Sequence, residues 1–342
     1  MKLADRFQLL RYPLIVLVVL IHADNREIIP DHFPEWKPLG FFGNWLRDLI
    51  SQDIARVAVP LFFAMSAYLF FLGFDGSREQ LLRKWKSRLR TLVVPYLAWN
   101  VLSFLLLKFN LLHAYWDIGV WSTFKMLVGI GNAPFLYHLW FIRDLILWVA
   151  LAPLWYVFAK RVPWLLLIVC AASYYLRLWE FPRPNPEGLF FFAVGAVLGL
   201  RSWQGVVIDR YRKFWIGIYV AFVLADSVRI WHGWAELVHR SSLVFGCIAL
   251  LAVAGIIKES KGRLLQSLET LGAASFFLYA SHEPFLRYIR YGMEVVMPRA
   301  IDAGAVVTYV VPALVAITVC TGVYYALIRR AEWSKTLFAG GR

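Results

Sequence analysis

Apolar segments recur along the whole of this chain, and their length constrains the fold more than any other feature. Of the 342 residues, 60% are hydrophobic, and the mean hydropathy is +0.60. Only helices and closed barrels satisfy their backbone groups in lipid, and about 20 apolar residues suffice for one helical crossing. We therefore predict an all-α, polytopic membrane helical bundle that forms one integral domain over residues 1–342. About ten transmembrane helices are expected, at roughly 8–24, 54–73, 91–112, 137–158, 163–177, 187–202, 214–230, 242–258, 270–286 and 303–328.

The connections between these segments differ in charge, and this difference predicts their orientation. Six basic residues and one acidic residue lie from Arg78 to Arg90, and Lys and Arg are enriched in cytoplasmic connections. We therefore expect a basic cytoplasmic loop at about 74–90, an outer loop at about 25–53, and both termini in the cytoplasm. Arg287, Arg290 and Arg299 oppose the rule, because they fall on the outer side.

The same asymmetry explains the net charge of +14, so we expect a lipid surface and no nucleic acid as the partner of these basic residues. The chain is predicted to be a multi-pass protein of the plasma membrane, in a bacterium the inner membrane.

Arg11 and His22 lie within the first apolar segment. Their spacing of eleven residues places both side chains on one helix face, about 16 Å apart along the axis. Ionisable groups inside a membrane span are costly and mark functional sites by default. We therefore predict that Arg11 and His22 have a functional role.

Further polar side chains are expected in the same membrane half as His22. Zinc would require three or four ligands drawn from such groups, and no local ligand spacing supports it, so no metal is expected. The charged neighbours among them are either functional residues or structural pairs that satisfy one another. The set comprises Asp53 and Arg56, His138, Arg143 and Asp144, Asp226 and Arg229, and His282 and Glu283.

The basic loop also has two interpretations. It could act only as a topology determinant that touches lipid headgroups, or it could bind an anionic cofactor, because guanidinium groups bind phosphates bidentately. Arg88 and Arg90 directly precede the third segment, where they would hold phosphates at the membrane surface.

Five stretches of the chain, in the same order, resemble the membrane-bound acyltransferase-3 family. The first is the Arg, ten intervening residues and His of the first segment. Two departures stand out: Ala67 replaces a usual Gly, and the usual Arg-x-x-Arg of the basic loop is absent, with Arg83, Lys86, Arg88 and Arg90 as its substitutes. The other four stretches are Val59 to Leu69, Arg88 to Tyr96, Tyr137 to Ile142, and Leu278 to Pro284.

The resemblance implies transfer of an acetyl or other short acyl group from acyl-coenzyme A to a carbohydrate hydroxyl, on a cell-surface polysaccharide or its lipid-linked precursor. It implies acetyl-coenzyme A as donor, a carbohydrate acceptor, and polysaccharide-assembly proteins as further partners. His22 would act as general base or carry the acyl group covalently, and Arg11 would bind a phosphate or polarise the thioester.

The remaining candidate residues follow from the same expectation. Donor phosphates would bind to the four basic loop residues named above, and His138 and Glu283 would orient His22. The residues expected to hold the sugar are Arg143, Asp144, His282 and Asp53.

Two other functions also fit intramembrane charges. One is a transporter or flippase of a lipid-linked sugar or acyl donor, although no internal repeat typical of transporters is evident. The other is an assembly subunit without chemistry, against which the shared face of Arg11 and His22 argues.

Overall fold

A computed structural model describes residues 2–24, 41–108, 119–178, 184–228, 232–296 and 302–341 of the chain. Within these ranges all regular structure is helical and no strand occurs, which confirms the all-α prediction. The chain forms two compact units. Unit 1 consists of Met1–Val59 and Gln204–Tyr325, and unit 2 consists of Pro60–Trp203 and Ala326–Arg342.

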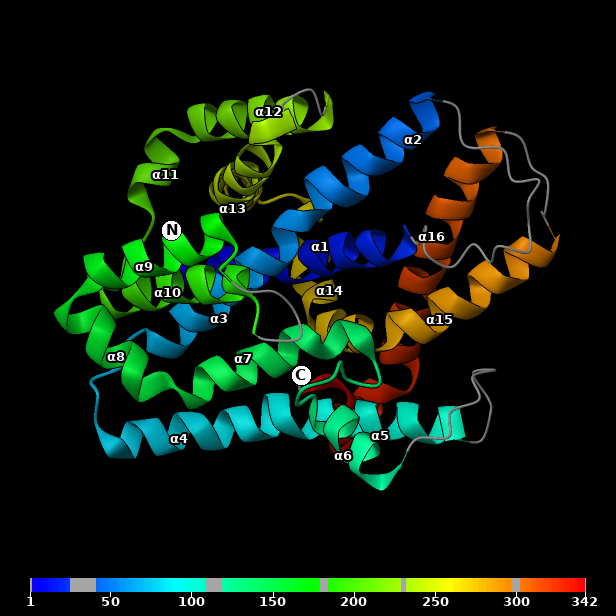
Figure 1. Ribbon diagram of the computed structural model, residues 1–342, viewed down its shortest axis with the longest axis horizontal. Coiled ribbons are helices and arrows are strands. Elements are labelled where there is room, and N and C mark those ends of the chain that lie inside the picture. The colour runs from blue at the N-terminus through cyan, green and yellow to red at the C-terminus, as the bar shows by residue number, and fades with distance from the viewer. Residues whose placement is uncertain are drawn as a thin grey trace. The chain divides into compact units, whose positions relative to one another are not determined.

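Unit 1 is built around α1, whose buried side chains include Leu14 and Val19. α1 contacts α13, α14 and α15, and α12 runs side by side with α13 (Figure 1). Its helices are α1 (Leu3–Ala23), α2 (Phe41–Asp48), the π-helical η2 (Leu49–Ile54), the short η3 (Ala55–Val57), α11 (Val206–Arg210), α12 (Arg212–Val228), the short η6 (His232–Trp234), α13 (Ala235–Ser260), α14 (Arg263–Leu271), the short η7 (Gly272–Ala274), α15 (Ser275–Val296) and α16 (Asp302–Ala326).

A buried arginine joins three helices of unit 1. The Arg6 side chain on α1 is 0% exposed, donates to the Leu251 carbonyl on α13 at 3.0 Å, and forms an ion pair with Asp209 on α11. A Cβ added at Gly255 would lie 3.1 Å from the Asp209 carboxylate. The absence of a side chain at residue 255 therefore leaves room for this pair.

Unit 2 depends on a close helix contact between α3 and α10. Gly195 and Gly199 of α10 form a Gly-x-x-x-Gly pattern, which lets membrane helices approach closely. A Cβ at Gly195 would lie 2.2 Å from the Ala64 carbonyl oxygen of α3. The helices of unit 2 are α3 (Ala58–Phe71), α4 (Arg78–Arg88), the π-helical η4 (Leu89–Val93), α5 (Val94–Lys108), α6 (Val120–Val128), the short η5 (Tyr137–Leu139), α7 (Trp140–Ala150), α8 (Ala152–Arg161), α9 (Pro163–Leu176), α10 (Pro186–Leu200), the short η8 (Ile328–Arg330) and α17 (Glu332–Ala339).

The segment expected as one helix at 137–158 is bent by 65° between α7 and α8. Pro153 has no N–H with which to bond the carbonyl of Val149, and its ring disfavours a straight helix. The Trp85 indole N–H donates to that same carbonyl at 2.9 Å. The Val149 carbonyl, which cannot accept a hydrogen bond from Pro153, is therefore satisfied by the Trp85 side chain.

Five helices of the described residues are long and apolar enough to cross a membrane, or six if the bent pair is counted as one. Each of the ten predicted ranges overlaps a helix, but α9 and α10 are short. Ten crossings and cytoplasmic termini therefore stay predictions. The five helices are Leu3–Ala23, Trp45–Phe71, Arg78–Leu106, Ala235–Ser260 and Tyr309–Arg330.

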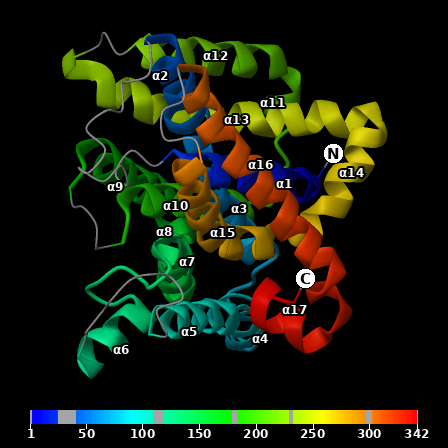
Figure 2. The same cartoon turned by 90° about the vertical axis from the view of Figure 1, so that its right-hand side faces the viewer.

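The connection predicted as a basic loop at about 74–90 is mostly helical. Ser77 caps α4 by accepting from the Gln80 backbone N–H at 3.3 Å. The Ser-x-x-Gln spacing is that of a capping box, which predicts a helix N-terminus. A loop was instead predicted here because of the many basic residues. α4 continues through η4 into α5, and α17 packs along α5 (Figures 1 and 2).

Candidate functional site

Two predicted site residues meet in unit 1. The rings of His22 on α1 and His282 on α15 have centroids 5.1 Å apart and are tilted by 58°. The His282 side chain is 0% exposed. Because α1 and α15 are separated by more than 250 residues in the chain, only the tertiary fold brings these imidazoles together.

Both rings are oriented by their own helices. His22 Nδ1 lies 2.9 Å from the carbonyl oxygen of Val18, and His282 Nδ1 lies 2.7 Å from that of Tyr279. A carbonyl can only accept, so Nδ1 carries the proton in both rings. In a neutral imidazole the lone pair then resides on Nε2. This is the form that can remove a proton from a hydroxyl.

Arg290 connects the two histidine helices. Its guanidinium donates to the main-chain carbonyl of His22 at 3.0 Å and lies 3.5 Å from the Glu283 carboxylate. Glu283 directly follows His282 on α15. The ion pair of Glu283 with Arg290 and the ring contact of His282 with His22 therefore involve the same part of this helix. The structure thus places His22 beside His282 and links it to Glu283 through Arg290. The catalytic and sugar-binding roles of these residues stay predictions.

The residue after the end of α1 also makes a polar cluster. Asp24 accepts from the Ser51 hydroxyl at 2.6 Å and from the Gln52 amide at 3.3 Å, and it pairs with Arg47 at 3.2 Å. α2 and η2 are therefore fastened two residues beyond His22.

The other two candidates of unit 1 have different surroundings. Arg11 lies on α1 with a partly exposed side chain. Asp53 is 2% exposed and lies in η2 beside Asp226 and His239. The predicted structural pair of Asp226 with Arg229 cannot be assessed, because Arg229 lies outside the described residues. Asp226 instead accepts from His239 at 2.6 Å.

Unit 2 contains the remaining predicted site residues of the polar set. His138 in η5 is buried. The Arg143 Nε donates to Asp144 at 2.8 Å, and the other oxygen of Asp144 accepts from the backbone N–H of Asn185 at 2.9 Å. Asp144 therefore holds α7 to the first turn of α10, which favours the structural interpretation of this pair. A role in sugar binding stays a prediction for Arg143 and Asp144, and orientation of His22 stays a prediction for His138.

The predicted donor-binding residues lie on α4 and η4. Arg83, Lys86 and Arg90 are exposed, and Arg88 is half-buried. Their spacing of three and seven places Arg83, Lys86 and Arg90 on one helix face, and we call these three residues the basic stripe. Arg90 donates to the Thr336 hydroxyl of α17 at 3.3 Å.

Sequence reasoning missed Arg290, Asp24, Ser51 and His239 as partners of the predicted residues. Arg290 had a visible signal, because it opposes the charge rule and follows Glu283 by seven residues, on the same helix face. Asp24, Ser51 and His239 had no such signal in the sequence, because their partners lie on other structural elements.

Comparison with known proteins identifies the family of this chain. Residues 5–326 match the family described as "Acyltransferase domain" (Acyl_transf_3). The succinoglycan biosynthesis protein ExoH of Rhizobium meliloti (strain 1021) is 25% identical over 306 residues, which cover 83% of this chain and 79% of that protein. No solved structure matches the chain. Since the match covers nearly the whole sequence and the predicted motifs, the chain belongs to the acyltransferase-3 family.

Proposed function

We propose that this protein is a membrane O-acyltransferase that moves an acetyl or other short acyl group from acyl-coenzyme A to a carbohydrate hydroxyl. The observation that carries the proposal is the pair of His22 and His282, whose Nδ1 atoms are both bound to carbonyls of their own helices. This arrangement presents a basic Nε2, which acyl transfer to an alcohol requires.

In the proposed acyl transfer, His22 is the general base, and every bond and proton is accounted for. The acceptor oxygen attacks the thioester carbonyl while His22 Nε2 takes the hydroxyl proton. The new C–O bond forms, the C–S bond breaks, and the proton passes to the departing thiolate, which leaves as coenzyme A. Arg290 holds His22 in position by donating to its main-chain carbonyl. His282 contacts the His22 ring and orients it.

The donor contributes phosphates, and the basic stripe supplies matching charge. Arg83, Lys86 and Arg90 form an exposed cationic face to which phosphates would bind. Arg11, partly exposed on the helix that also carries His22, would polarise the thioester carbonyl or bind a phosphate.

The acceptor is inferred from the relative and the family. ExoH is named for the biosynthesis of succinoglycan, a polysaccharide, so we place the acceptor hydroxyl on a surface polysaccharide or its lipid-linked precursor. The charge asymmetry of the sequence favours a bacterial inner membrane protein that receives its donor from the cytoplasm.

The first test is turnover of radiolabelled acetyl-coenzyme A and succinyl-coenzyme A by the full chain in nanodiscs, with an exopolysaccharide as acceptor. His22→Gln should lower kcat by about 10²–10⁴-fold, the usual contribution of a general base. Thermal melting and gel filtration must match wild type, because a misfolded variant would be uninformative. Near-normal kcat in folded His22→Gln would refute the role of this residue.

The basic stripe is tested by Arg83→Ala/Lys86→Ala. The donor KM should rise about tenfold or more, since each charge-assisted phosphate contact contributes on the order of 1 kcal/mol. Lys261→Ala/Arg263→Ala is the matched control, because it removes two exposed basic residues at another site. An equal effect of both double variants would contradict specific phosphate binding, and no turnover of any acyl-coenzyme A would favour a transporter.

A further inference from the structure

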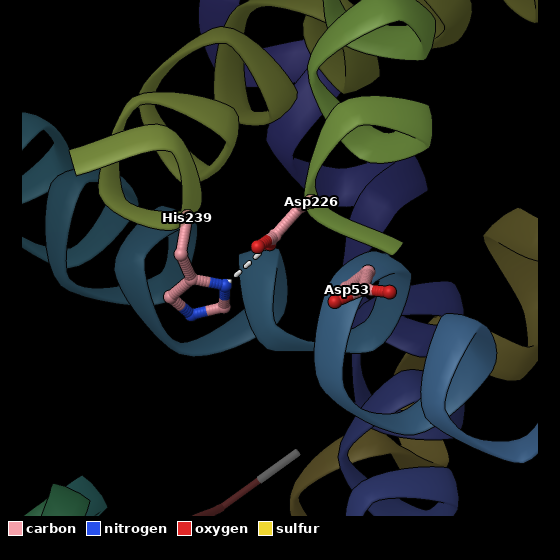
Figure 3. Close-up of side chains that lie close together, drawn as sticks. All are labelled: Asp53, Asp226 and His239. Atoms are coloured by element: carbon pink, nitrogen blue, oxygen red, sulfur yellow. Dashed lines mark hydrogen bonds and ion pairs between the residues drawn. The ribbon is translucent and has the colours of Figure 1, made fainter. Parts of the chain in front are cut away.

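Unit 1 contains a second cluster of titratable side chains, made of residues other than His22 and His282. Asp53 comes from η2, Asp226 from α12 and His239 from α13 (Figure 3). Their nearest ligand atoms all lie within 4.8 Å of one another. Asp53 is 2% exposed and Asp226 is 9% exposed. Three separate elements therefore place one imidazole and two largely buried carboxylates around one point.

These three groups are those that a divalent transition metal prefers. Zinc binds imidazole nitrogen and carboxylate oxygen at about 2.0–2.2 Å, so tetrahedral ligands lie about 3.4 Å apart. The present upper separation of 4.8 Å requires the ligand atoms to approach by about 1.4 Å or less.

The short contact within the cluster is compatible with a metal. His239 Nδ1 lies 2.6 Å from Asp226 Oδ2. Two groups held that close by a shared proton must move about 0.8 Å apart to become zinc ligands. The ring proton would then reside on Nε2, and His239 is partly exposed, so that N–H can reach solvent.

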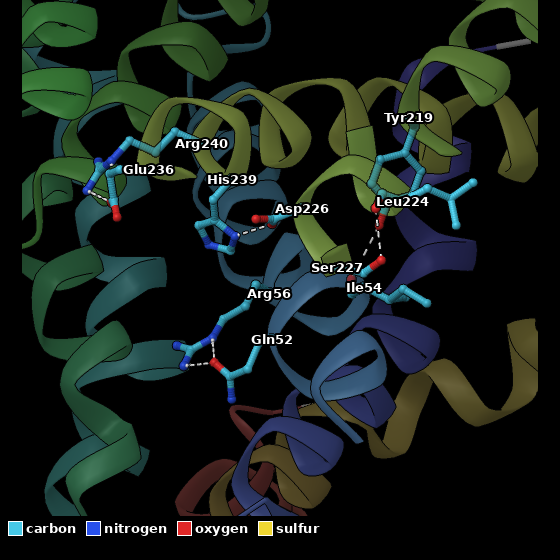
Figure 4. A network of polar contacts seen from close by, with 10 residues as sticks. All are labelled: Gln52, Ile54, Arg56, Tyr219, Leu224, Asp226, Ser227, Glu236, His239 and Arg240. Carbon is cyan, nitrogen blue, oxygen red and sulfur yellow. Dashed lines mark hydrogen bonds and ion pairs between the residues drawn. The ribbon is translucent and has the colours of Figure 1, made fainter. Parts of the chain in front are cut away.

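Neighbouring cations are engaged by other groups. The Arg56 guanidinium binds the Gln52 amide oxygen at 2.7 and 3.1 Å, and Arg240 pairs with Glu236 at 2.7 Å (Figure 4). Gln52 and Glu236 are thus partners of these two arginines. A bound cation would also balance the negative charge of the two carboxylates.

We propose that Asp53, Asp226 and His239 bind one divalent transition metal, with zinc as the first choice, and that water completes its coordination. The metal ties η2 to the pair of helices α12 and α13. η2 also supplies Ser51 and Gln52 to Asp24, two residues beyond His22. The site is structural, and its existence does not depend on the proposed acyl transfer. From the sequence no metal was expected, because no local ligand spacing supported one. The three ligands proposed here lie 173 and 13 residues apart.

The test uses the full chain in detergent micelles with its purification tag removed, since a histidine tag binds zinc. Protein treated with EDTA and then dialysed is titrated with Zn²⁺, and binding is followed by calorimetry, elemental analysis and the shift in Tm. We expect about one Zn²⁺ per chain and a higher Tm when it is bound. Asp226→Asn and His239→Gln should weaken binding by at least about tenfold.

Glu259→Gln is the matched control, because it breaks another polar pair between the same helices, Arg212 to Glu259 at 2.7 Å. It should bind zinc as wild type does. Asp53→Asn is a second variant that leaves the contact between His239 and Asp226 in place, so loss of binding there cannot be assigned to that contact. Wild-type protein that binds neither Zn²⁺ nor Mn²⁺ would overturn the proposal, and so would equal weakening in Glu259→Gln. Neither readout requires turnover, so failure of the metal site is distinguishable from failure of the proposed enzyme.

Discussion

The contact between α10 and α3 makes a sharp prediction about stability. In Gly195→Ala the new methyl would lie 2.2 Å from the Ala64 carbonyl oxygen and 2.9 Å from the Ala64 Cα. An ordinary contact is more than 1 Å longer than the first of these distances, so the helices must separate. Overpacking of this kind costs about 1–3 kcal/mol. Ala is favoured over Gly in a helix by about 1 kcal/mol, so the net loss is about 0–2 kcal/mol.

Gly217→Ala on α12 isolates the packing effect. Nothing lies within 4 Å of a Cβ at Gly217, so this variant gains the helix preference and loses nothing. The difference between the two variants is therefore the overpacking cost of about 1–3 kcal/mol, which corresponds to about 1–4 °C in Tm for a chain of this size. Thermal melting in the same micelles measures it. The reasoning is refuted if Gly195→Ala melts at or above the Tm of Gly217→Ala.

The remaining predictions concern two arginines of unit 1. Arg290→Met removes the donor to the His22 carbonyl and leaves Glu283 without its ion pair, so kcat should fall about tenfold or more, while Arg290→Lys should restore part of it; unchanged kcat in Arg290→Met would exclude the positioning role. Asp209→Ala leaves the guanidinium of Arg6 buried without its carboxylate and should lower the free energy of unfolding by about 2–4 kcal/mol. Chemical denaturation in micelles measures this loss, and an effect below about 0.5 kcal/mol would show that water reaches Arg6.

The apolar segments and the family motifs were readable from the sequence, but most contacts were not. Each predicted range overlaps a helix because hydrophobic length alone determines it. The 65° bend between α7 and α8 was not predicted, because a proline inside a membrane helix need not bend it. The hydrogen bond from Trp85 to the Val149 carbonyl is a tertiary contact that the sequence does not reveal. The helix α4 was taken for a loop, since its charge outweighed the capping signal of Ser77 and Gln80.

The candidate site was predictable only in part, for a related reason. The motif resemblance pointed to His22 and His282, but periodicity within one helix cannot say that two helices bring their rings to 5.1 Å. The contact of Asp226 with His239 crosses from α12 to α13, so the helical spacing favoured Arg229 instead. Contacts between elements require the tertiary fold.

The pair of Arg6 and Asp209 also has a consequence for the synthesis of the chain. The two residues are 203 positions apart, and ribosomes add about 5–20 residues per second. The first helix therefore waits about 10–40 s before the carboxylate that neutralises its buried guanidinium exists. During this interval we expect α1 to remain at the membrane surface or with the insertion machinery. Nascent chains stalled at residue 203 should be degraded faster than chains stalled past Asp209, and equal half-lives in a pulse-chase measurement would exclude this dependence. α1 is translated before α11 and α13, so its contacts with these two helices can form only late in synthesis.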